Sequence, residues 1–277
     1  MRVGICVNEK KQDAAAYYFR LSELFEAHGV EVVTAGKHSM SGDVFADCDL
    51  IISIGGDGTF LRVASSAVER EIPVFGFNLG TIGFLTEFEP DSIEETVSRI
   101  CDGRYSIEER SVLATYVVSE GQKRFFGYAV NDAVLTREVD ANVCHLSVEI
   151  NGAFVGTYPC DGIIVATQTG STAYSLSAGG PIIAPGNDVI LVTPICSHKM
   201  GSRTIVAHHD STVKVTPAGK AKKLRLIVDG QTSAKLREDE RVVCECADKK
   251  VKIVRIDPPN FYAAVAEKLF GESGTGG

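Results

Sequence analysis

The most chemically suggestive stretch of the sequence is Gly55-Gly56-Asp57-Gly58-Thr59, which places one carboxylate among three glycines. The apolar run 50–54 before it predicts a buried strand, and the helical spacing that begins at Phe60 predicts a helix after it. Glycines let the backbone lie close to a ligand, and the free N–H groups of a helix start suit a phosphate. The junction therefore predicts a phosphate-binding loop formed by Gly55, Gly56, Gly58 and Thr59.

An ionised carboxylate repels a phosphate ligand, so the presence of Asp57 in such a loop indicates a specific chemical role. The positive end of the helix dipole keeps it ionised, and it could hold a divalent cation or accept a proton from an attacking hydroxyl group. A glycine turn with a helix-capping aspartate is the alternative interpretation. The loop is neither a Walker A motif nor a G-x-G-x-x-G motif. Arg62, one turn into the predicted helix, could neutralise phosphate.

Polar residues also interrupt apolar runs further along the chain. Asn131 could pair with the edge of a nucleobase and Asp132 could accept two ribose hydroxyls, although a strand end or turn would explain both residues. The hydroxyl-rich stretch 167–181 lies within a region without charge, 162–186, and suits a base, a sugar and a phosphate. The glycine-containing stretch 78–85 is either a ligand-lining crossover loop or a linker.

Composition bounds the class of protein. The 277 residues are 44% hydrophobic and 23% charged with a net charge of -8, which predicts a globular protein of one large or two medium domains. An acidic chain without a long basic run is a poor candidate for nucleic-acid binding, and no apolar run is long enough for a membrane. Eight cysteines form no C-x-x-C pair, and six histidines show no ligand spacing. Residues 2–7 predict a strand rather than a signal peptide, so we expect a cytoplasmic protein.

The order of predicted elements suggests two domains. Strands and helices alternate over residues 1–103, which predicts an α/β domain with a Rossmann-like open parallel sheet and with Asp57 beyond the carboxyl ends of its strands. Residues 104–257 predict an all-β sandwich domain. The strand candidates in it are 111–118, 125–130, 145–150, 163–166, 188–192, 212–216, 224–228, 241–246 and 251–256. Residues 258–271 predict a helix that packs back on the first domain, and residues 272–277 predict a flexible tail.

Taken together, these motifs resemble those of the NAD kinase family. They occur in the order of the family and cover most of the chain. The glycine motif alone is shared with diacylglycerol kinase-like and phosphofructokinase-like enzymes, whereas the run from Thr169 to Ser177 is much more specific. The matching positions are Gly55–Thr59, Asn78, Gly80, Gly83–Leu85, Asn131–Asp132, Asp161–Gly162, Thr169–Ser177 and Val228–Gly230.

The resemblance implies transfer of the γ-phosphoryl group of ATP, with polyphosphate as an alternative donor, to the adenosine-ribose 2′-hydroxyl of NAD, which gives NADP. It implies Mg²⁺ as the divalent ion, a site in the crevice between an α/β domain and a β-sandwich, and a homodimer or homotetramer. By analogy Asp57 is the proton acceptor, and Gly58 and Arg62 contact phosphate. The implied contacts are Asn131, Thr172, Ala173 and Ser177 around the adenine, Asp132, Asp161 and Tyr174 around the nicotinamide riboside, and Ser175 and Gln231 elsewhere on the substrate.

The sequence departs from the family pattern at Pro159, where many members carry an arginine two positions before the equivalent of Asp161. Two other interpretations stay open at this point. A lipid kinase could use the same glycine motif, although the chain lacks a basic amphipathic helix for membrane docking. A module that binds NADP(H) without turnover could use the same polar residues.

Overall fold

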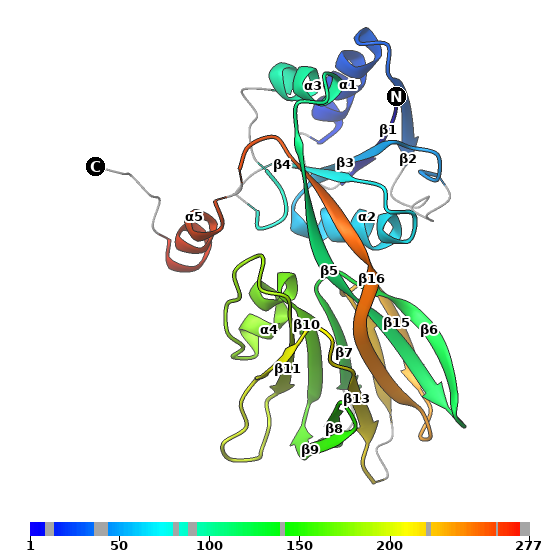
Figure 1. Ribbon diagram of the computed structural model, residues 1–277, viewed down its shortest axis with the longest axis vertical. Helices are drawn as coiled ribbons and strands as arrows, with labels where there is room; N and C mark the ends of the chain where they lie inside the picture. Colours follow the sequence, from blue (N-terminus) through cyan, green and yellow to red (C-terminus); the bar gives the residue numbers. More distant parts are fainter. Residues whose placement is uncertain are drawn as a thin grey trace. The chain divides into compact units, whose positions relative to one another are not determined.

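The computed structural model of the protein describes residues 1–8, 14–35, 44–79, 83–87, 93–138, 142–219, 223–258 and 260–271. The chain forms two compact units, Met1–Arg110 with Val251–Gly277 and Ser111–Lys250. It passes from one unit to the other within two long strands, β5 (Ser106–Ser119) and β16 (Arg241–Arg255) (Figure 1). The boundaries predicted at 104 and 257 lie just outside these strands. No helix of the described residues is long and apolar enough to cross a membrane.

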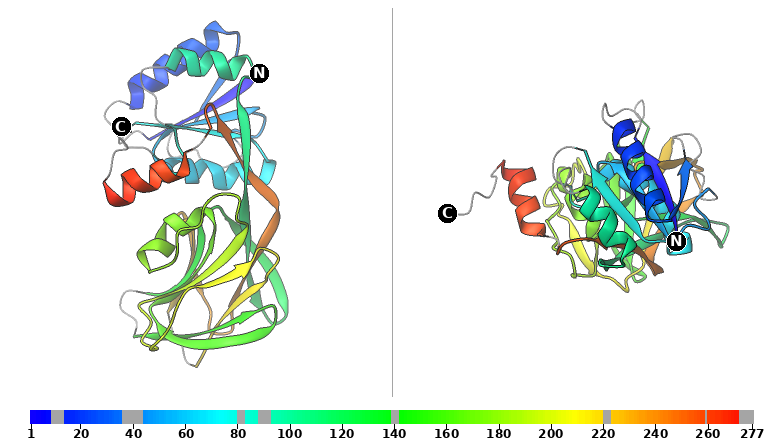
Figure 2. Two further views of the ribbon diagram at one scale, coloured as in Figure 1. Left: turned by 60° about the vertical axis from the view of Figure 1, so that its left-hand side comes forward. Right: turned by 90° about the horizontal axis from the view of Figure 1, so that it is seen from above.

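The first unit contains a parallel sheet in the order β2-β1-β3-β4, which confirms the predicted α/β class. Helices α1 and α3 cover one face of this sheet and α2 covers the other (Figure 2). The end of β16 joins the sheet, where Ile253 lies opposite Val74. The elements are β1 (Arg2–Val7), α1 (Ala14–Ala27), β2 (Glu31–Ala35), β3 (Leu50–Gly55), α2 (Asp57–Arg70), β4 (Val74–Asn78), α3 (Ile93–Cys101), α5 (Phe261–Val265) and the π-helical turn η3 (Ala266–Phe270).

Burial of apolar side chains fixes this arrangement. Phe25 of α1 and Val97 of α3 are fully buried in one cluster with Ile52 of β3. On the other face, α2 buries Phe60 and Val63. Each such side chain contributes about 2 kcal/mol through apolar burial. Because β3 and β4 are parallel and Gly55 lies opposite Asn78, the loops after both strands begin at the same edge of the sheet.

The second unit is all β and has two sheets that share one core, which confirms the predicted sandwich. One sheet has the order β12-β11-β10-β7-β14-β15, and the other contains β16, β13, β8, β9, β5 and β6. The core takes buried side chains from both sheets, such as Leu146 of β8 and Val165 of β10. The elements are β6 (Gln122–Ala129), β7 (Asp132–Arg137), β8 (Cys144–Ile150), β9 (Ala153–Cys160), β10 (Gly162–Thr167), η2 (Thr169–Thr172), α4 (Tyr174–Ser177), β11 (Val189–Ile195), β12 (Ile205–His208), β13 (Val213–Pro217), β14 (Leu224–Val228) and β15 (Thr232–Leu236).

Candidate functional site

Asp57 is the first residue of α2 and directly follows the carboxyl end of β3. The turn before it is closed by the carbonyl oxygen of Gly56, which accepts the amide hydrogens of Thr59 at 2.8 Å and Phe60 at 3.1 Å. Gly55 has no room for a side chain, because a Cβ there would lie 2.4 Å from Thr59 Oγ1. A Cβ at Gly58 would meet no atom within 4 Å, so this part of the loop is open.

The carboxylate of Asp57 accepts four hydrogen bonds. Its Oδ2 accepts the amide hydrogen of Phe84 at 3.0 Å and the ammonium of Lys268 at 3.0 Å. Its Oδ1 accepts the amide hydrogen of Leu85 at 3.2 Å and the hydroxyl hydrogen of Thr86 at 3.1 Å. Two of these donors are main-chain groups of one short loop, so the position of the carboxylate depends on the path of that loop.

Gly83 lets this loop approach Asp57 closely. A Cβ at Gly83 would lie 2.3 Å from Asp57 Oδ1 and 2.0 Å from Thr86 Oγ1, distances that no side chain tolerates. The loop is fastened to the sheet by the Glu87 amide, which donates to the Gly76 carbonyl at 2.8 Å. The sequence left open whether the stretch 78–85 lines a ligand or links domains. Its described part, from Gly83 onward, holds Asp57, whereas residues 80–82 lie outside the described ranges.

A buried arginine also supports this loop. Arg255 of β16 is only 3% exposed, and its guanidinium donates to the Leu85 carbonyl at 3.2 Å and to Glu108 at 2.7 Å. Glu108 also pairs with Arg110 at 2.7 Å, and Glu87 lies 3.5 Å from Arg255. The sequence analysis did not identify this cluster, because no local pattern relates β16 to a loop about 170 residues earlier.

The surroundings of Asp57 keep it ionised. Burial raises the pKa of its carboxyl group, but the charge of Lys268 and the hydrogen bonds from Phe84 and Leu85 more than offset this. The pKa therefore lies below its ordinary value. Arg62 lies five positions further on α2, is exposed, and its charge acts on the thiol of Cys6.

A second group of predicted residues lies in the second unit, where strand ends meet at one edge of a sheet. Asp132 at the start of β7 lies opposite Ala166 near the end of β10, and Ala133 lies opposite Val228 at the end of β14. The carboxylate of Asp229, which follows β14, accepts the amide hydrogens of Val130 at 2.8 Å, of Asn131 at 2.8 Å and of Asp132 at 3.0 Å. Asp229 thus fixes the backbone that carries Asn131 and Asp132.

Asn131 offers an unused polar atom at this edge. Its Oδ1 is buried and accepts no hydrogen bond from the described chain. Gly170 of η2 packs directly on the same residue, because a Cβ there would lie 2.1 Å from the Asn131 carbonyl oxygen. Gly170 also donates its amide hydrogen to Thr167 Oγ1 at 3.1 Å. The hydroxyl-rich stretch 167–181 therefore lies against Asn131 at Gly170.

Asp132 has an unusual ionisation. Burial is the main cause that raises its pKa to about 7, and the nearby charge of Asp229 adds to the effect. Tyr174, the first residue of α4, is half exposed, and its pKa is raised by burial and by the charges of Cys196, Asp161 and Asp132. Tyr174 therefore lies within electrostatic reach of both aspartates.

Asp161 lies at the other end of β10 from Asp132. The strand register pairs Gly162 with Thr136 and Ala166 with Asp132, so the two aspartates are about 16 Å apart along the strands. Asp161 forms an ion pair with Arg137 of the neighbouring strand at 2.7 Å. A cation therefore lies beside Asp161 although position 159 is a proline.

The remaining predicted residues differ in how accessible their polar groups are. Ser175 is fully buried and its hydroxyl bonds Thr193 at 2.9 Å, so it faces the protein interior rather than a ligand. Ser177 and Gln231 are exposed, and Thr172 and Ala173 are half-buried. A hollow of about 570 Å³ next to the end of α4 is lined by residues that the sequence analysis did not identify, among them Cys196, Lys199 and Arg203.

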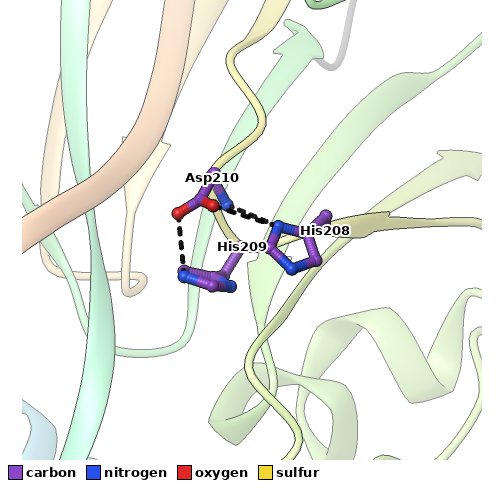
Figure 3. A group of neighbouring side chains, drawn as sticks. All are labelled: His208, His209 and Asp210. Carbon is purple, nitrogen blue, oxygen red and sulfur yellow. Dashed lines mark hydrogen bonds and ion pairs between the residues drawn. The ribbon is translucent and has the colours of Figure 1, made fainter.

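Among the described residues, three neighbouring side chains could share a metal ion: His208, His209 and Asp210 (Figure 3). His208 is the last residue of β12 and the other two lie in the turn that follows, where Asp210 contacts His208 Nδ1 at 3.3 Å and His209 Nε2 at 2.8 Å. The Asp210 amide also donates to His208 Nδ1 at 3.4 Å, and each oxygen of the Asp210 carboxylate already contacts an imidazole. We therefore assign no metal to this exposed turn.

The chain is similar to known proteins over nearly its whole length. Models of the ATP-NAD kinase N-terminal domain and the ATP-NAD kinase C-terminal domain match residues 39–105 and 130–256. The NAD kinase of Caldicellulosiruptor bescii is 39% identical over 97% of this chain and 99% of its own length. A crystal structure of an NAD kinase from Archaeoglobus fulgidus in complex with ATP has a TM-score of 0.78 at 26% identity and covers 98% of both chains. The structure of yeast NADH kinase complexed with NADH has a TM-score of 0.86 at 23% identity over 99% of this chain and 89% of its own, a likeness of fold.

Proposed function

The chain belongs to the NAD kinase family, and from that premise we propose that it transfers the γ-phosphoryl group of ATP to the adenosine-ribose 2′-hydroxyl of NAD. The 2′-oxygen forms a new bond to the γ-phosphorus. The bond from that phosphorus to the oxygen shared with the β-phosphate breaks, and its electron pair leaves on ADP. The hydroxyl proton passes to Asp57 and then to solvent, so that the products are NADP, ADP and one proton.

The single observation that carries this proposal is the Asp57 carboxylate, held ionised at the start of α2 by the loop that contains Phe84 and Leu85. A carboxylate with a lowered pKa is a poor base for a free alcohol. In a loose phosphoryl-transfer transition state, however, the proton leaves late. Asp57 therefore mainly orients the 2′-hydroxyl and receives its proton as the new bond forms.

The glycine loop is the phosphate-binding part of the proposal. The start of α2 supplies unpaired N–H groups and the positive end of a helix dipole. The open space over Gly58 lets a phosphate approach the backbone without meeting a side chain. Gly55, Gly56 and Thr59 form the turn that presents those groups, and Arg62 adds positive charge on the same helix.

Asn131 is the main contact for the adenine. Its buried Oδ1 lacks a donor within the described chain, and the exocyclic amino group of adenine is a donor of the required kind. Thr172, Ala173 and Ser177 surround the base, and Gln231 contacts the ligand from the turn after β14. Ser175 acts through its bond to Thr193, which positions α4.

Asp132 and Asp161 take different parts of the dinucleotide, because they lie at opposite ends of paired strands. Asp132 contacts the adenosine half together with Asn131, and Asp161 contacts the nicotinamide riboside together with Tyr174. This proposal differs from the expectation that both aspartates contact the nicotinamide riboside. Arg137 beside Asp161 supplies the cation that Pro159 does not.

We propose that Mg²⁺ binds to the phosphoryl donor and not to a permanent site in the protein. Within the described residues, no group of three or more potential ligands surrounds Asp57, and its carboxylate is already occupied by four donors. Mg²⁺ prefers phosphate oxygens and several waters to a protein cage. We therefore infer that Mg²⁺ would be held by the phosphate oxygens of ATP or polyphosphate, where it would supply neutralisation of their negative charge.

Membership of the NAD kinase family also bears on the oligomeric state and the cellular compartment of the protein. We propose a homodimer or homotetramer, to be tested by the mass in solution. All eight cysteines are free thiols, which supports a reducing cytoplasm.

The experiment that tests the proposed function is a coupled assay on the purified chain. Protein, NAD, ATP and Mg²⁺ are incubated, and a dehydrogenase specific for NADP reports the product. Formation of NADP at a rate proportional to protein concentration supports the proposal. Binding of NAD without NADP formation would instead favour a nucleotide-sensing module, and phosphorylation of diacylglycerol alone would favour a lipid kinase.

A further inference from the structure

The hydrogen bonds of Asp57 leave no position for a substrate hydroxyl. An ionised carboxylate has about four lone-pair sites, two on each oxygen. Phe84 and Lys268 fill the sites of Oδ2, and Leu85 and Thr86 fill those of Oδ1. A 2′-hydroxyl group that donates to Asp57 must therefore displace one of these four donors.

Lys268 is the donor that can be exchanged. The other three belong to the loop that Gly83, Arg255 and the main-chain bonds of Glu87 hold in place. Lys268 instead reaches Asp57 from η3 through a flexible side chain of four methylene groups. Displacing it moves one flexible side chain. Displacing Phe84 or Leu85 moves the main chain of the loop, and displacing Thr86 rotates a side chain that is only 3% exposed.

The helix that carries Lys268 is attached to the same loop at few points. The ammonium of Lys268 lies 4.7 Å from the centre of the Phe84 ring. The ring of Phe261 packs on the Phe84 ring with centroids 6.0 Å apart. Tyr262 and Phe270 of this helix are 72% and 67% exposed. Elements with few buried contacts lie at the low-stability end of a protein and move most readily.

A cation at this position has a use in the reaction. The segment Gly55–Thr59 contains no lysine or arginine, while the γ-phosphoryl group carries negative charge that must be neutralised as it moves. A substrate hydroxyl that replaces Lys268 would donate its hydrogen to Asp57 Oδ2. The γ-phosphorus that this hydroxyl attacks would then be bonded directly to the hydroxyl oxygen in the product. An ammonium displaced from Oδ2 by a few ångströms remains beside that phosphorus.

We propose that Lys268 is a catalytic residue of the phosphoryl transfer, which pairs with Asp57 before substrates bind and contacts the transferred phosphoryl group during the reaction. The proposal rests on the function proposed above. Lys268 gives up its hydrogen bond to Asp57 as the 2′-hydroxyl makes one, and donates instead to an oxygen of the γ-phosphoryl group. It remains protonated throughout, and the proton of the hydroxyl passes to Asp57.

The test compares Lys268→Met, which removes the charge at similar length, with Lys268→Arg, which retains it. Lys252→Met is the matched control, because Lys252 belongs to the same unit and pairs with Glu71 at 3.4 Å. The Lys252 side chain is 28% exposed and the Lys268 side chain is 25% exposed. Steady-state kinetics in the coupled assay give kcat and KM for both substrates, and calorimetry gives the Kd of NAD. The unfolding temperature shows whether each variant is folded.

We expect Lys268→Met to lower kcat about 10²-fold or more, as does loss of other transition-state charge contacts, with the Kd of NAD changed less than about threefold. Lys268→Arg should recover at least about tenfold of that loss, and Lys252→Met should match the wild type. The acid limb of the pH profile of kcat/KM should move upward in Lys268→Met alone, because a charge that lowers the pKa of Asp57 has gone.

Two results would overturn the proposal. Wild-type kcat in a folded Lys268→Met variant would show that the ammonium does not act on the phosphoryl group. An increase in kcat would show that Lys268 only blocks Asp57. Either outcome differs from failure of the proposed function, in which the wild-type chain and Lys252→Met would themselves make no NADP.

Discussion

Arg255 donates a hydrogen bond to the carbonyl oxygen of Leu85 at 3.2 Å, and the amide of that same Leu85 donates to Asp57 at 3.2 Å. A buried guanidinium of one strand thus sets the direction of a peptide group that holds the carboxylate proposed to be catalytic. Positioning within a fraction of an ångström matters for phosphoryl transfer, because the enzyme works mainly by orientation and charge neutralisation.

Replacing Arg255 by methionine should lower kcat about tenfold and also destabilise the fold. Glu108 and Glu87 would lose their buried partner, and breaking such a pair costs about 3 to 5 kcal/mol of unfolding free energy. Urea unfolding and the coupled assay measure both effects. Arg104→Met is the control, because Arg104 pairs with Asp102 on the surface of the same unit. Unchanged kcat in folded Arg255→Met would mean that Leu85 is positioned by the loop alone.

Gly83→Ala should abolish most of the activity while the protein stays folded. The added Cβ would meet Asp57 Oδ1 at 2.3 Å and Thr86 Oγ1 at 2.0 Å, so the loop must move away from the carboxylate. A misplacement of about 1 Å costs on the order of 10²-fold in rate. Gly127→Ala, where a Cβ meets nothing within 4 Å, should keep wild-type kinetics. Equal kcat for the two alanine variants would refute the role of the close approach at Gly83.

Asp132→Asn should change how stability depends on pH. Burial and Asp229 raise the pKa of Asp132 from 3.8 to about 7, so the folded protein keeps a proton that the unfolded chain releases. The contribution to stability is full below about pH 4 and is lost as pH rises to about 7, at on the order of 1 kcal/mol per pH unit.

The asparagine variant lacks this loss, so it should gain stability relative to the wild type between pH 5 and pH 8. Urea unfolding of both proteins at the two pH values measures the difference. A constant difference in unfolding free energy would show that Asp132 titrates at an ordinary pKa. The same variant should bind NAD more weakly, since a neutral amide accepts ribose hydroxyls less strongly than a carboxylate.

The sequence predicted the parts of the fold that local patterns encode. The strand–glycine–helix junction at Asp57 is confirmed. The dipeptide Asn151-Gly152, which is typical of a hairpin turn, joins β8 to β9 with positive φ angles of 52° and 77°. The strand candidates 241–246 and 251–256 were wrong as separate strands, because β16 is continuous. Strands β7, β9, β12 and β15 were not among the predicted strands. In β9, Tyr158 and Cys160 are buried although the run is broken by Gly156 and Pro159.

The candidate site was predictable only where its residues share a motif. Asp57, Asn131 and Thr172 stand out in the sequence by residue type and spacing. Lys268 and Arg255 do not, because each acts on a loop about 170 or more residues away and neither has neighbours of unusual composition. Side-chain contacts of this range depend on how strands and helices pack, which no local pattern specifies.

The decisive measurement is the turnover and the NAD affinity of Asp57→Asn, because Asp57 is the proposed proton acceptor. We expect the Kd of NAD by calorimetry to stay within about threefold of the wild type, while NADP formation falls by about 10³-fold or more, because the amide can neither accept the hydroxyl proton nor attract it as a carboxylate does. An Asp57→Asn protein that makes NADP at the wild-type rate would contradict the account.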